Sequence, residues 1–375
     1  MSKKIVLLNT FHVSFDDRVF YHQAKSLSSH GFEVKIISTK GDCIQNVENI
    51  SINSFNDSDL SNSEKINEIT RRLIDFSPAI IICDSPSAII AANKYKKNRE
   101  VRIIYDITEW YPSKLHLQYT HGIRKPLKFI VLLMLNLFAG LNSDSFIFGE
   151  YYKSVVFRRL FFWKKFIQLP YYPDLNYIQN YPLKPVTSEM NLLYCGKINT
   201  DRGIDAVIMA IESAAVKYQE IQFRLKIIGI FPTIKDQNHF NDLVSGLPGN
   251  IQISIEKLLP FSEFCKSIGN THLIFDLRKI DFESTHCLPI KLFYYLACGR
   301  PVLYSDLLAI RHHIKEFDFG YLCHPKDIPS IATHITDYIA NPGLYLEHAG
   351  NALEISRSTY NWKAIENDFL TFIDS

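Results

Sequence analysis

The segment Cys287-Leu-Pro-Ile-Lys-Leu-Phe-Tyr-Tyr-Leu-Ala-Cys-Gly-Arg-Pro-Val302 decides the fold of this chain. It predicts a loop, a helix that Pro289 opens, a stop at Gly299 and a strand that runs through Val302. Proline suits the first position of a helix, where its missing N–H would be unpaired, and glycine suits the left-handed residue after a helix. The free N–H groups and partial positive charge of such a helix start bind anions. We therefore expect an anion, such as a diphosphate, at Pro289, Ile290 and Lys291.

Apolar runs alternate with helical patterns on both sides of this segment. In the first half, we expect a helix at 17–29 and strands at 4–8, 33–38, 79–83, 101–105, 145–148 and 166–169. After the polar stretch 172–188 the pattern restarts, with a helix at 203–218 and strands at 191–195, 223–228, 251–255, 273–277 and 301–304. Continuous apolar strands between helices are typical of parallel sheets that are covered on both faces. The fold class is therefore α/β, with two doubly wound, Rossmann-like domains facing a cleft in which ligands bind.

Composition narrows the function classes. A chain of 375 residues fits two domains, and 47% apolar with 21% charged residues describes a globular protein. The net charge of +2 gives no overall field that would favour nucleic acid as a partner. The seven cysteines are dispersed and the 13 histidines form no metal-binding motif, so we expect no metal and no cofactor. The apolar run 5–8 is too short for a signal peptide, and the run 129–141 is too short for a membrane span.

A second motif follows the first strand of the second half, Cys195-Gly-Lys-Ile-Asn-Thr-Asp-Arg-Gly203. Gly196 permits close approach of the backbone to a ligand. Lys197 and Arg202 place two cations beside the carboxyl end of the strand, where they could neutralise a departing diphosphate. On spacing alone, a solvated basic pair in a loop is the simpler interpretation.

Further segments recur in a recognisable order: Asp17-Arg-Val, Gly31-Phe-Glu-Val34, Tyr105-Asp-Ile-Thr-Glu-Trp-Tyr-Pro112, Pro170-Tyr-Tyr-Pro173, Phe319-Gly-Tyr-Leu322 and Tyr360-Asn-Trp362. Together with the two motifs above, they resemble the glycosyltransferase 4-like family, also called glycosyl transferases group 1, over nearly the whole chain. That family has the GT-B fold. Basic residues stand at the positions of Lys197 and Arg202, which the resemblance makes catalytic groups rather than a solvated pair.

The resemblance also implies domain limits. We expect an acceptor-side Rossmann-like domain at 1–178 and a nucleotide-sugar-binding Rossmann-like domain at 179–358. A C-terminal helix at 359–375 would cross back to the first domain.

The chain departs from the family at binding positions. Many members carry two glutamates with seven residues between them, the first at the donor sugar and the second at the ribose; here these positions hold His286 and Tyr294. Either a binding role or a structural role fits each of them. Lys291 keeps the family pattern and adds positive charge at the helix start, and the alternative is an ordinary surface lysine. Glu109 could orient an acceptor hydroxyl, whereas Asp106 more often caps a turn at such a junction.

Basic residues mixed with apolar ones suggest a membrane surface. Arg124-Lys-Pro-Leu-Lys128 precedes the apolar run 129–141, and Phe157-Arg-Arg-Leu-Phe-Phe-Trp-Lys-Lys-Phe166 mixes bases with aromatic rings. Such segments suit the headgroup region of an anionic bilayer. An ordinary core helix with basic ends is the alternative, and the resemblance favours the membrane because related enzymes commonly act on lipid-linked acceptors.

The resemblance implies glycosyl transfer from a nucleotide-diphosphate sugar to a glycan or lipid-linked acceptor, in bacterial surface polysaccharide synthesis. Retention of the anomeric configuration and independence of metals would follow, with the protein in the cytoplasm at the inner face of the membrane. The altered glutamate positions leave an alternative, a degenerate GT-B protein that binds a nucleotide sugar or a partner enzyme without turnover. A nucleotide-sugar epimerase shares the layout, but it would need acid/base groups that we cannot place.

Overall fold

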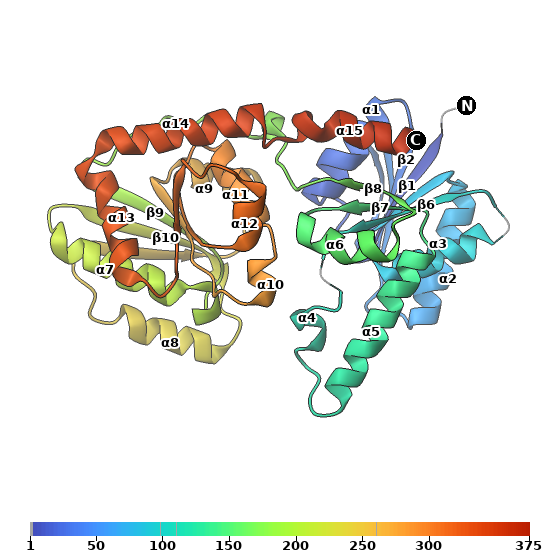
Figure 1. Cartoon of the computed structure of the whole chain (residues 1–375), viewed down its shortest axis with the longest axis horizontal. Helices are drawn as coiled ribbons and strands as arrows, with labels where there is room; N and C mark the ends of the chain where they lie inside the picture. The colour runs from blue at the N-terminus through green and yellow to red at the C-terminus, as the bar shows by residue number, and fades with distance from the viewer. Residues whose placement is uncertain (1–2, 98, 110, 260) are drawn as a thin grey trace. The chain divides into compact units, whose positions relative to one another are not determined.

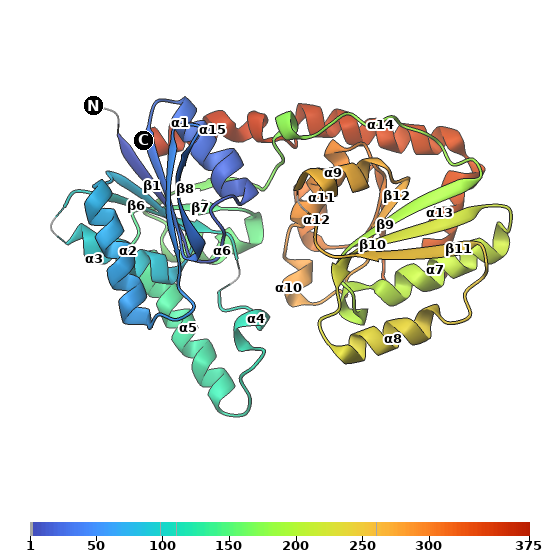
Figure 2. The same cartoon turned by 180° about the vertical axis from the view of Figure 1, so that it is seen from behind.

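The computed structural model describes residues 3–97, 99–109, 111–259 and 261–375, without the side chains of Leu115, Phe261 and Ser262 (Figures 1 and 2). Contacts within the chain divide it into two units. The first is Met1–Tyr171 with Ile365–Ser375, and the second is Tyr172–Ala364. The sequence placed the corresponding boundaries after residues 178 and 358. Trp110, part of the family-like segment 105–112, lies outside the described residues.

The first unit is built on an eight-stranded sheet in the order β3-β4-β2-β1-β5-β6-β7-β8. Its strands are β1 (Lys4–Asn9), β2 (Glu33–Ser38), β3 (Lys40–Val47), β4 (Ile50–Asn56), β5 (Ile80–Cys83), β6 (Arg102–Ile107), β7 (Ser145–Phe148) and β8 (Lys165–Gln168). All pairings are parallel except that of β3 with β4. The central strands are buried on both faces, as the continuous apolar runs predicted.

Helices follow most of these strands. They are the π-helix η1 (Asp17–Ala24), α1 (Lys25–Ser29), α2 (Asn62–Phe76), α3 (Pro86–Lys96), α4 (Lys114–Leu117), α5 (Arg124–Leu141) and α6 (Tyr151–Leu160). The helix predicted at 17–29 is thus a π-helical segment followed by one α-helical turn. The last helix, α15 (Trp362–Asp374), also contacts this unit, because Arg102 donates hydrogen bonds to the carbonyls of Phe372 (3.0 Å) and Ile373 (2.8 Å).

The second unit has a six-stranded, all-parallel sheet in the order β11-β10-β9-β12-β13-β14. Its strands are β9 (Glu189–Lys197), β10 (Gln222–Ile230), β11 (Ile251–Glu256), β12 (Leu273–Asp276), β13 (Val302–Ser305) and β14 (Gly320–Cys323). In chain order this is the 3-2-1-4-5-6 arrangement of a Rossmann sheet, with its switch point between β9 and β12. In sheets of this order, ligands bind outside the carboxyl ends of the strands at the switch point.

Helices cover both faces of the second sheet (Figures 1 and 2). They are the 3-10 segments η2 (Leu175–Tyr177) and η3 (Thr200–Arg202), and the α-helices α7 (Ile204–Lys217), α8 (Ile234–Val244), α9 (Phe261–Gly269), α10 (Phe282–Thr285), α11 (Ile290–Ala297), α12 (Leu308–His313), α13 (Ile328–Ala340) and α14 (Pro342–Ser358). Two parallel-sheet, Rossmann-like units confirm the fold class predicted from the sequence.

Candidate functional site

The loop after β9 is held in one conformation by its own residues. The Tyr194 hydroxyl donates to the carbonyl oxygens of Lys197 (2.6 Å) and Arg202 (3.2 Å). The Asn199 side chain accepts a hydrogen bond from the backbone N–H of Arg202 at 3.0 Å. Tyr194 is buried, while the side chains of Lys197 and Arg202 are exposed. The backbone is therefore fixed from below, and both cations extend outward from it.

This loop meets the end of the neighbouring strand β12. Gly203 has a φ of +80°, and a Cβ atom there would stand 1.8 Å from the carbonyl oxygen of Leu277, so only glycine fits. The backbone N–H of Lys279 donates to the carbonyl of Asp201 at 2.9 Å. The two strands that flank the switch point are thus tied together where they end, and Lys197 and Arg202 lie at that point.

Lys291 comes to the same place from the first turn of α11. Its ammonium group donates to the carbonyl oxygen of Cys195 and lies 3.5 Å from where a Cβ atom on Gly196 would stand. Lys291 is half-buried, so the interpretation as an ordinary surface lysine is wrong. Burial lowers the pKa of Lys291 and the charges of Arg278 and Arg202 lower it further, against the opposing charge of Asp276. The structure thus brings Gly196, Arg202 and Lys291 together around one strand end.

The helix start predicted for a diphosphate is displaced by one residue. Helix α11 begins at Ile290, and Pro289 is its N-cap with φ −76° and ψ 118°, not its first helical residue. Pro289 is buried and Ile290 is exposed. At the other end of α11, Gly299 has a φ of +65°. Its backbone N–H donates to the carbonyl oxygen of Leu296, and the backbone N–H of Arg300 donates to the carbonyl oxygen of Tyr295. These two bonds form a Schellman motif and confirm the predicted glycine stop.

His286 and Tyr294 both contribute to the packing of the second unit. The Nδ1 atom of His286 lies 2.7 Å from the carbonyl oxygen of Phe282, and the two rings are 4.6 Å apart, so His286 caps the end of α10. Tyr294 is only 4% exposed. Their predicted contacts with the donor sugar and the ribose stay predictions.

A buried polar network beneath the strand ends was not predicted from the sequence. Arg278 donates to Asp276 through Nε (2.7 Å) and through Nη2, and the Tyr304 hydroxyl donates to the same carboxylate at 2.6 Å. Burial raises the pKa of Asp276, but the charge and hydrogen bond of Arg278, helped by Lys291, bring that pKa below its ordinary value. Asp276 is therefore the anion that balances two cations near the ligand position. The available signal was a carboxylate and an arginine at the end of an apolar run.

In the first unit, the two carboxylates named from the sequence, Asp106 and Glu109, have different surroundings. Asp106 is buried within β6 and accepts from Arg18 through Nε (2.9 Å) and Nη2 (2.8 Å), and from Gln23 at 2.8 Å. Its expected role as a turn cap is therefore wrong, because both oxygens are used in a buried ion pair. Glu109, just beyond β6, is exposed.

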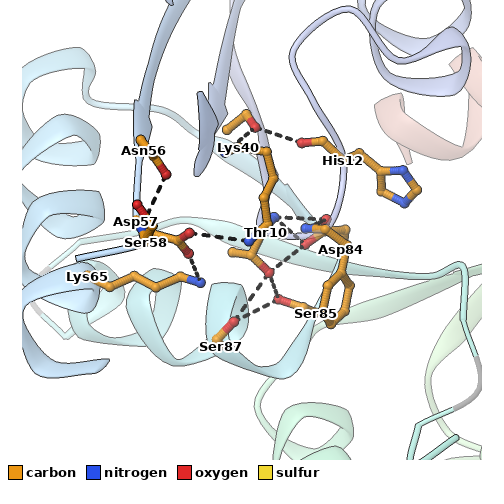
Figure 3. Close-up of polar contacts among 12 residues, drawn as sticks. Thr10, His12, Lys40, Asn56, Asp57, Ser58, Lys65, Asp84, Ser85 and Ser87 are labelled. Atoms are coloured by element: carbon orange, nitrogen blue, oxygen red, sulfur yellow. Dashed lines mark hydrogen bonds and ion pairs between the residues drawn. The ribbon is translucent and has the colours of Figure 1, made fainter. Parts of the chain in front are cut away.

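The switch point of the first sheet lies between β1 and β5, and Asp84 follows β5 directly. Its carboxylate accepts from the backbone N–H groups of Thr10 and Phe11, each at 2.9 Å. Figure 3 shows the hydroxyls of Thr10, Ser85 and Ser87 gathered beside it. Desolvation raises the pKa of Asp84 despite these donors. This polar group was not predicted from the sequence. The feature that could have indicated it is a carboxylate directly after an apolar strand.

A charged histidine lies close to Asp84. His12 pairs with Asp16, with its Nδ1 3.2 Å from a carboxylate oxygen. Burial opposes the charge, but the hydrogen bond and charge of Asp16, with the charges of Asp84 and Asp106, raise the pKa of His12 to about 9. His12 therefore carries a positive charge at neutral pH, at the carboxyl edge of the first sheet.

Comparisons with known proteins place the architecture. No protein-family model matches the chain, and no curated protein sequence matches it either. Solved structures do. Sucrose-phosphate synthase from Thermosynechococcus elongatus has a TM-score of 0.73 at 13% identity, over 99% of this chain and 98% of that one.

Two further structures agree over similar lengths. Anabaena Alr3699/HepE, in complex with UDP, has a TM-score of 0.71 at 11% identity, over 99% of both chains. WaaG, a glycosyltransferase involved in lipopolysaccharide biosynthesis, has a TM-score of 0.68 at 14% identity, over 97% of this chain and 98% of that one. At these identities the likeness concerns the fold, and the chain has the fold of the GT-B glycosyltransferases.

Proposed function

We propose that this protein is a glycosyltransferase of the glycosyltransferase 4-like family, which moves a sugar from a nucleotide-diphosphate sugar to a glycan or lipid-linked acceptor. One observation carries the proposal: Lys291 and Arg202 converge on the end of β9 beside Gly196, with Lys197 next in the chain. Three cations at a Rossmann switch point fit a diphosphate better than any other common ligand.

The chemistry follows from that charge. When the bond between the sugar and the diphosphate breaks, negative charge develops on the departing phosphate oxygens. Lys197, Arg202 and Lys291, together with the N-terminal turn of α11 at Pro289 and Ile290, would stabilise that charge. Gly196 lets the phosphate approach the backbone, since no side chain stands in the way. No metal and no cofactor are needed for this step, because the protein supplies the positive charge.

The remaining roles are assigned by the family resemblance. His286 would contact the donor sugar, Tyr294 the ribose, and Glu109 the acceptor hydroxyl. Retention of the anomeric configuration, a place in bacterial surface polysaccharide synthesis, and a cytoplasmic location in peripheral contact with the inner face of the membrane complete the proposal. Support for a nucleotide-sugar donor also comes from structural neighbours that were solved with UDP-glucose or UDP-2-fluoro glucose.

A second function has its own observation. Tyr294 is 4% exposed and His286 is bonded to Phe282, so neither replaces the paired carboxylates of the family in an obvious way. A degenerate protein that binds a nucleotide sugar or a partner enzyme, without turnover, would tolerate these residues. The cations would then serve binding alone.

Both functions are tested with the purified protein and a panel of UDP-, GDP- and dTDP-sugars. Calorimetry measures binding, and nucleotide release with and without added lipid extract measures turnover. We expect one donor to bind, and Lys197→Ala to weaken its binding about tenfold, as loss of a charge-assisted contact predicts. Lys235→Ala, an exposed lysine on α8, is the matched control and should leave binding unchanged.

The outcomes separate the alternatives. Binding with nucleotide release supports the transferase, and binding without release under any condition supports the degenerate protein. If no donor binds, the diphosphate site does not exist and both proposals fail.

A further inference from the structure

Helix α5 presents an apolar stripe that the rest of the first unit does not cover. Figure 1 shows this helix projecting from the sheet of the first unit. The two most exposed members in its middle turns, Leu127 and Met134, are 62% and 60% exposed. The stripe, which we call the docking surface, repeats at helical spacing: Leu127, Ile130, Val131, Met134, Phe138 and Leu141.

The buried residues of this helix lie in its C-terminal half. Asn136, which interrupts the apolar run, is buried; its oxygen accepts from the Tyr105 hydroxyl at 2.9 Å and its nitrogen donates to the carbonyl of Tyr111 at 2.8 Å. Residues 121–131 are all exposed. The polar residue therefore anchors the C-terminal half to β6, and the N-terminal half extends away with its apolar side chains in solvent. Exposed apolar patches of this kind mark binding surfaces.

A second exposed element joins the anchored end. A Cβ atom on Gly140 would collide with the ring of Phe161, and Lys164 donates to the carbonyls of Gly140 (2.7 Å) and Leu141 (2.8 Å). The turn after α6 is thus packed against the last turn of α5. Its Phe162 and Trp163 are 80% and 60% exposed. The docking surface therefore continues into two aromatic side chains.

Charge indicates the partner. The sequence contains no aspartate or glutamate at 110–143 or at 151–173. The first of these segments carries Arg124, Lys125 and Lys128 at the start of α5, and the second carries Arg158, Arg159 and Lys165 around the aromatic turn. An apolar stripe flanked by these cations complements a surface that is apolar within and anionic outside. A second copy would fit poorly, because pairing would bring the cations of the two copies together.

The length of α5 bears on whether this helix could span a bilayer or would lie in its interfacial region. Its 18 residues extend about 27 Å. In the described part of the chain, no helix combines the length and apolar character needed to cross a bilayer. Trp and basic side chains favour the boundary between headgroups and acyl chains.

We propose that α5 and the turn 160–166 dock on an anionic bilayer, with the apolar stripe and Trp163 in the interfacial region and the cations among lipid phosphates. The docking itself needs no donor chemistry. It rests on the proposed function in one respect, that the bilayer supplies a lipid-linked acceptor. Glu109 and α5 lie in the same connection between β6 and β7, so a docked α5 holds the chain of the acceptor loop close to the membrane.

The test uses the full chain and two kinds of vesicle, phosphatidylcholine alone and equal parts of phosphatidylcholine and phosphatidylglycerol. We expect co-sedimentation with the anionic vesicles, loss of most of it at about 0.5 M salt, and little with the neutral ones. The triple variant Arg124→Gln/Lys125→Gln/Lys128→Gln should bind about 100-fold more weakly, as expected for three bases near an anionic surface. Lys217→Gln/Lys235→Gln/Lys257→Gln, three exposed lysines of the second unit, is the control.

The apolar contribution has its own pair of variants. Leu127→Gln/Met134→Gln should weaken anionic binding about tenfold or more, because two side chains no longer enter the interface. Ile234→Gln/Leu258→Gln changes two comparably exposed apolar residues in the second unit and should have no effect. Trp163 gives a readout in the unaltered fold: its emission should shift to shorter wavelength with anionic vesicles, and Trp163→Phe should remove the shift.

Three results would overturn the proposal. They are absence of vesicle binding by the wild type, equal binding to both vesicles, and a dimer in solution that Leu127→Gln/Met134→Gln dissociates. Donor binding is measured on the same preparations. Vesicle binding without donor binding would refute the proposed function alone, whereas donor binding without vesicle binding would refute the docking alone.

Discussion

The ammonium nitrogen of Lys291 lies 3.5 Å from the point where a Cβ atom on Gly196 would stand. The glycine at the end of β9 therefore lies beside a cation from a helix that begins more than ninety residues later in the chain. The same ammonium donates to the carbonyl of Cys195, so strand and helix share one charged contact.

Gly196→Ala should weaken the binding of a nucleotide diphosphate about tenfold, the effect of losing one charge-assisted contact. The methyl group would contact the ammonium at an ordinary distance of 3.5 Å, but the φ of +151° at this residue is strained for any other amino acid, so the backbone beside the ammonium would shift. Calorimetric titration with UDP measures the change. Gly249→Ala is the control, since a Cβ atom there has no neighbour within 4 Å. Equal affinities for the two variants would contradict the contact.

Lys291→Met should reduce UDP affinity by about 100-fold, a loss of about 2–3 kcal/mol, while the free energy of unfolding changes by about 1 kcal/mol or less. Stability changes little because the variant also removes a partly desolvated charge. Lys279→Met, which changes an exposed lysine in the neighbouring loop, should alter neither quantity. A large loss of stability without loss of affinity would make Lys291 a structural residue.

The same lysine predicts a pH dependence. Burial, with the charges of Arg278 and Arg202, lowers the pKa of Lys291 in the free protein. The charged form binds the diphosphate, so UDP affinity should fall as pH rises, and should begin to fall below the ordinary lysine pKa of about 10.4. Titrations across the alkaline range should show this decline in the wild type and not in Lys291→Met. Parallel curves for both proteins would exclude Lys291 as its origin.

Arg18→Met should lower the free energy of unfolding by about 3–5 kcal/mol, because it leaves the buried Asp106 carboxylate without its ion-pair partner. Urea unfolding measures the loss. Arg71→Met breaks an exposed pair with Glu68 and should cost less than about 1 kcal/mol. Similar losses for the two variants would show that the Arg18 pair contributes no more than a surface one.

His12 should make the free energy of unfolding fall as the pH rises into the alkaline range. Its pKa is raised to about 9 in the folded protein, against about 6.5 when unfolded, so its contribution is complete below about pH 6.5 and is lost as pH rises through about 9. We expect the contribution to be on the order of 2 kcal/mol. Unfolding of His12→Gln and of wild type, compared at several pH values, isolates it. His121→Gln, at an exposed position, should leave the pH dependence unchanged.

The sequence predicted the central strands well because a buried parallel strand has a continuous run of apolar residues, as in β1 and β9. It did not predict β3, whose side chains are mostly exposed and polar. That strand exists because it pairs with β4 through a turn at Glu48 and Asn49, both with positive φ (50° and 65°). Such a turn usually contains a glycine, and neither of these two residues is one.

The candidate site was predictable in part for a similar reason. Lys197, Arg202 and Lys291 were proposed from the order of the motifs along the chain and from the helix start. Asp276 and Asp84 were missed because their importance depends on which strands are neighbours, which only the sheet order reveals. The exposure of α5 was also beyond the sequence, since a core helix and an interfacial helix can have the same apolar pattern.

The Schellman motif that ends α11 has a consequence for the thermodynamics of donor binding. The side chain of Arg300, the residue that closes the motif, is buried and donates to the carbonyls of Pro182 and Gly269 and to the Tyr345 hydroxyl. Three segments of the second unit are therefore hydrogen-bonded to the C-terminal end of the helix. Since α11 is already ordered, its N-terminal turn loses little conformational freedom when a diphosphate arrives. Association should thus carry almost no entropic penalty from ordering the backbone.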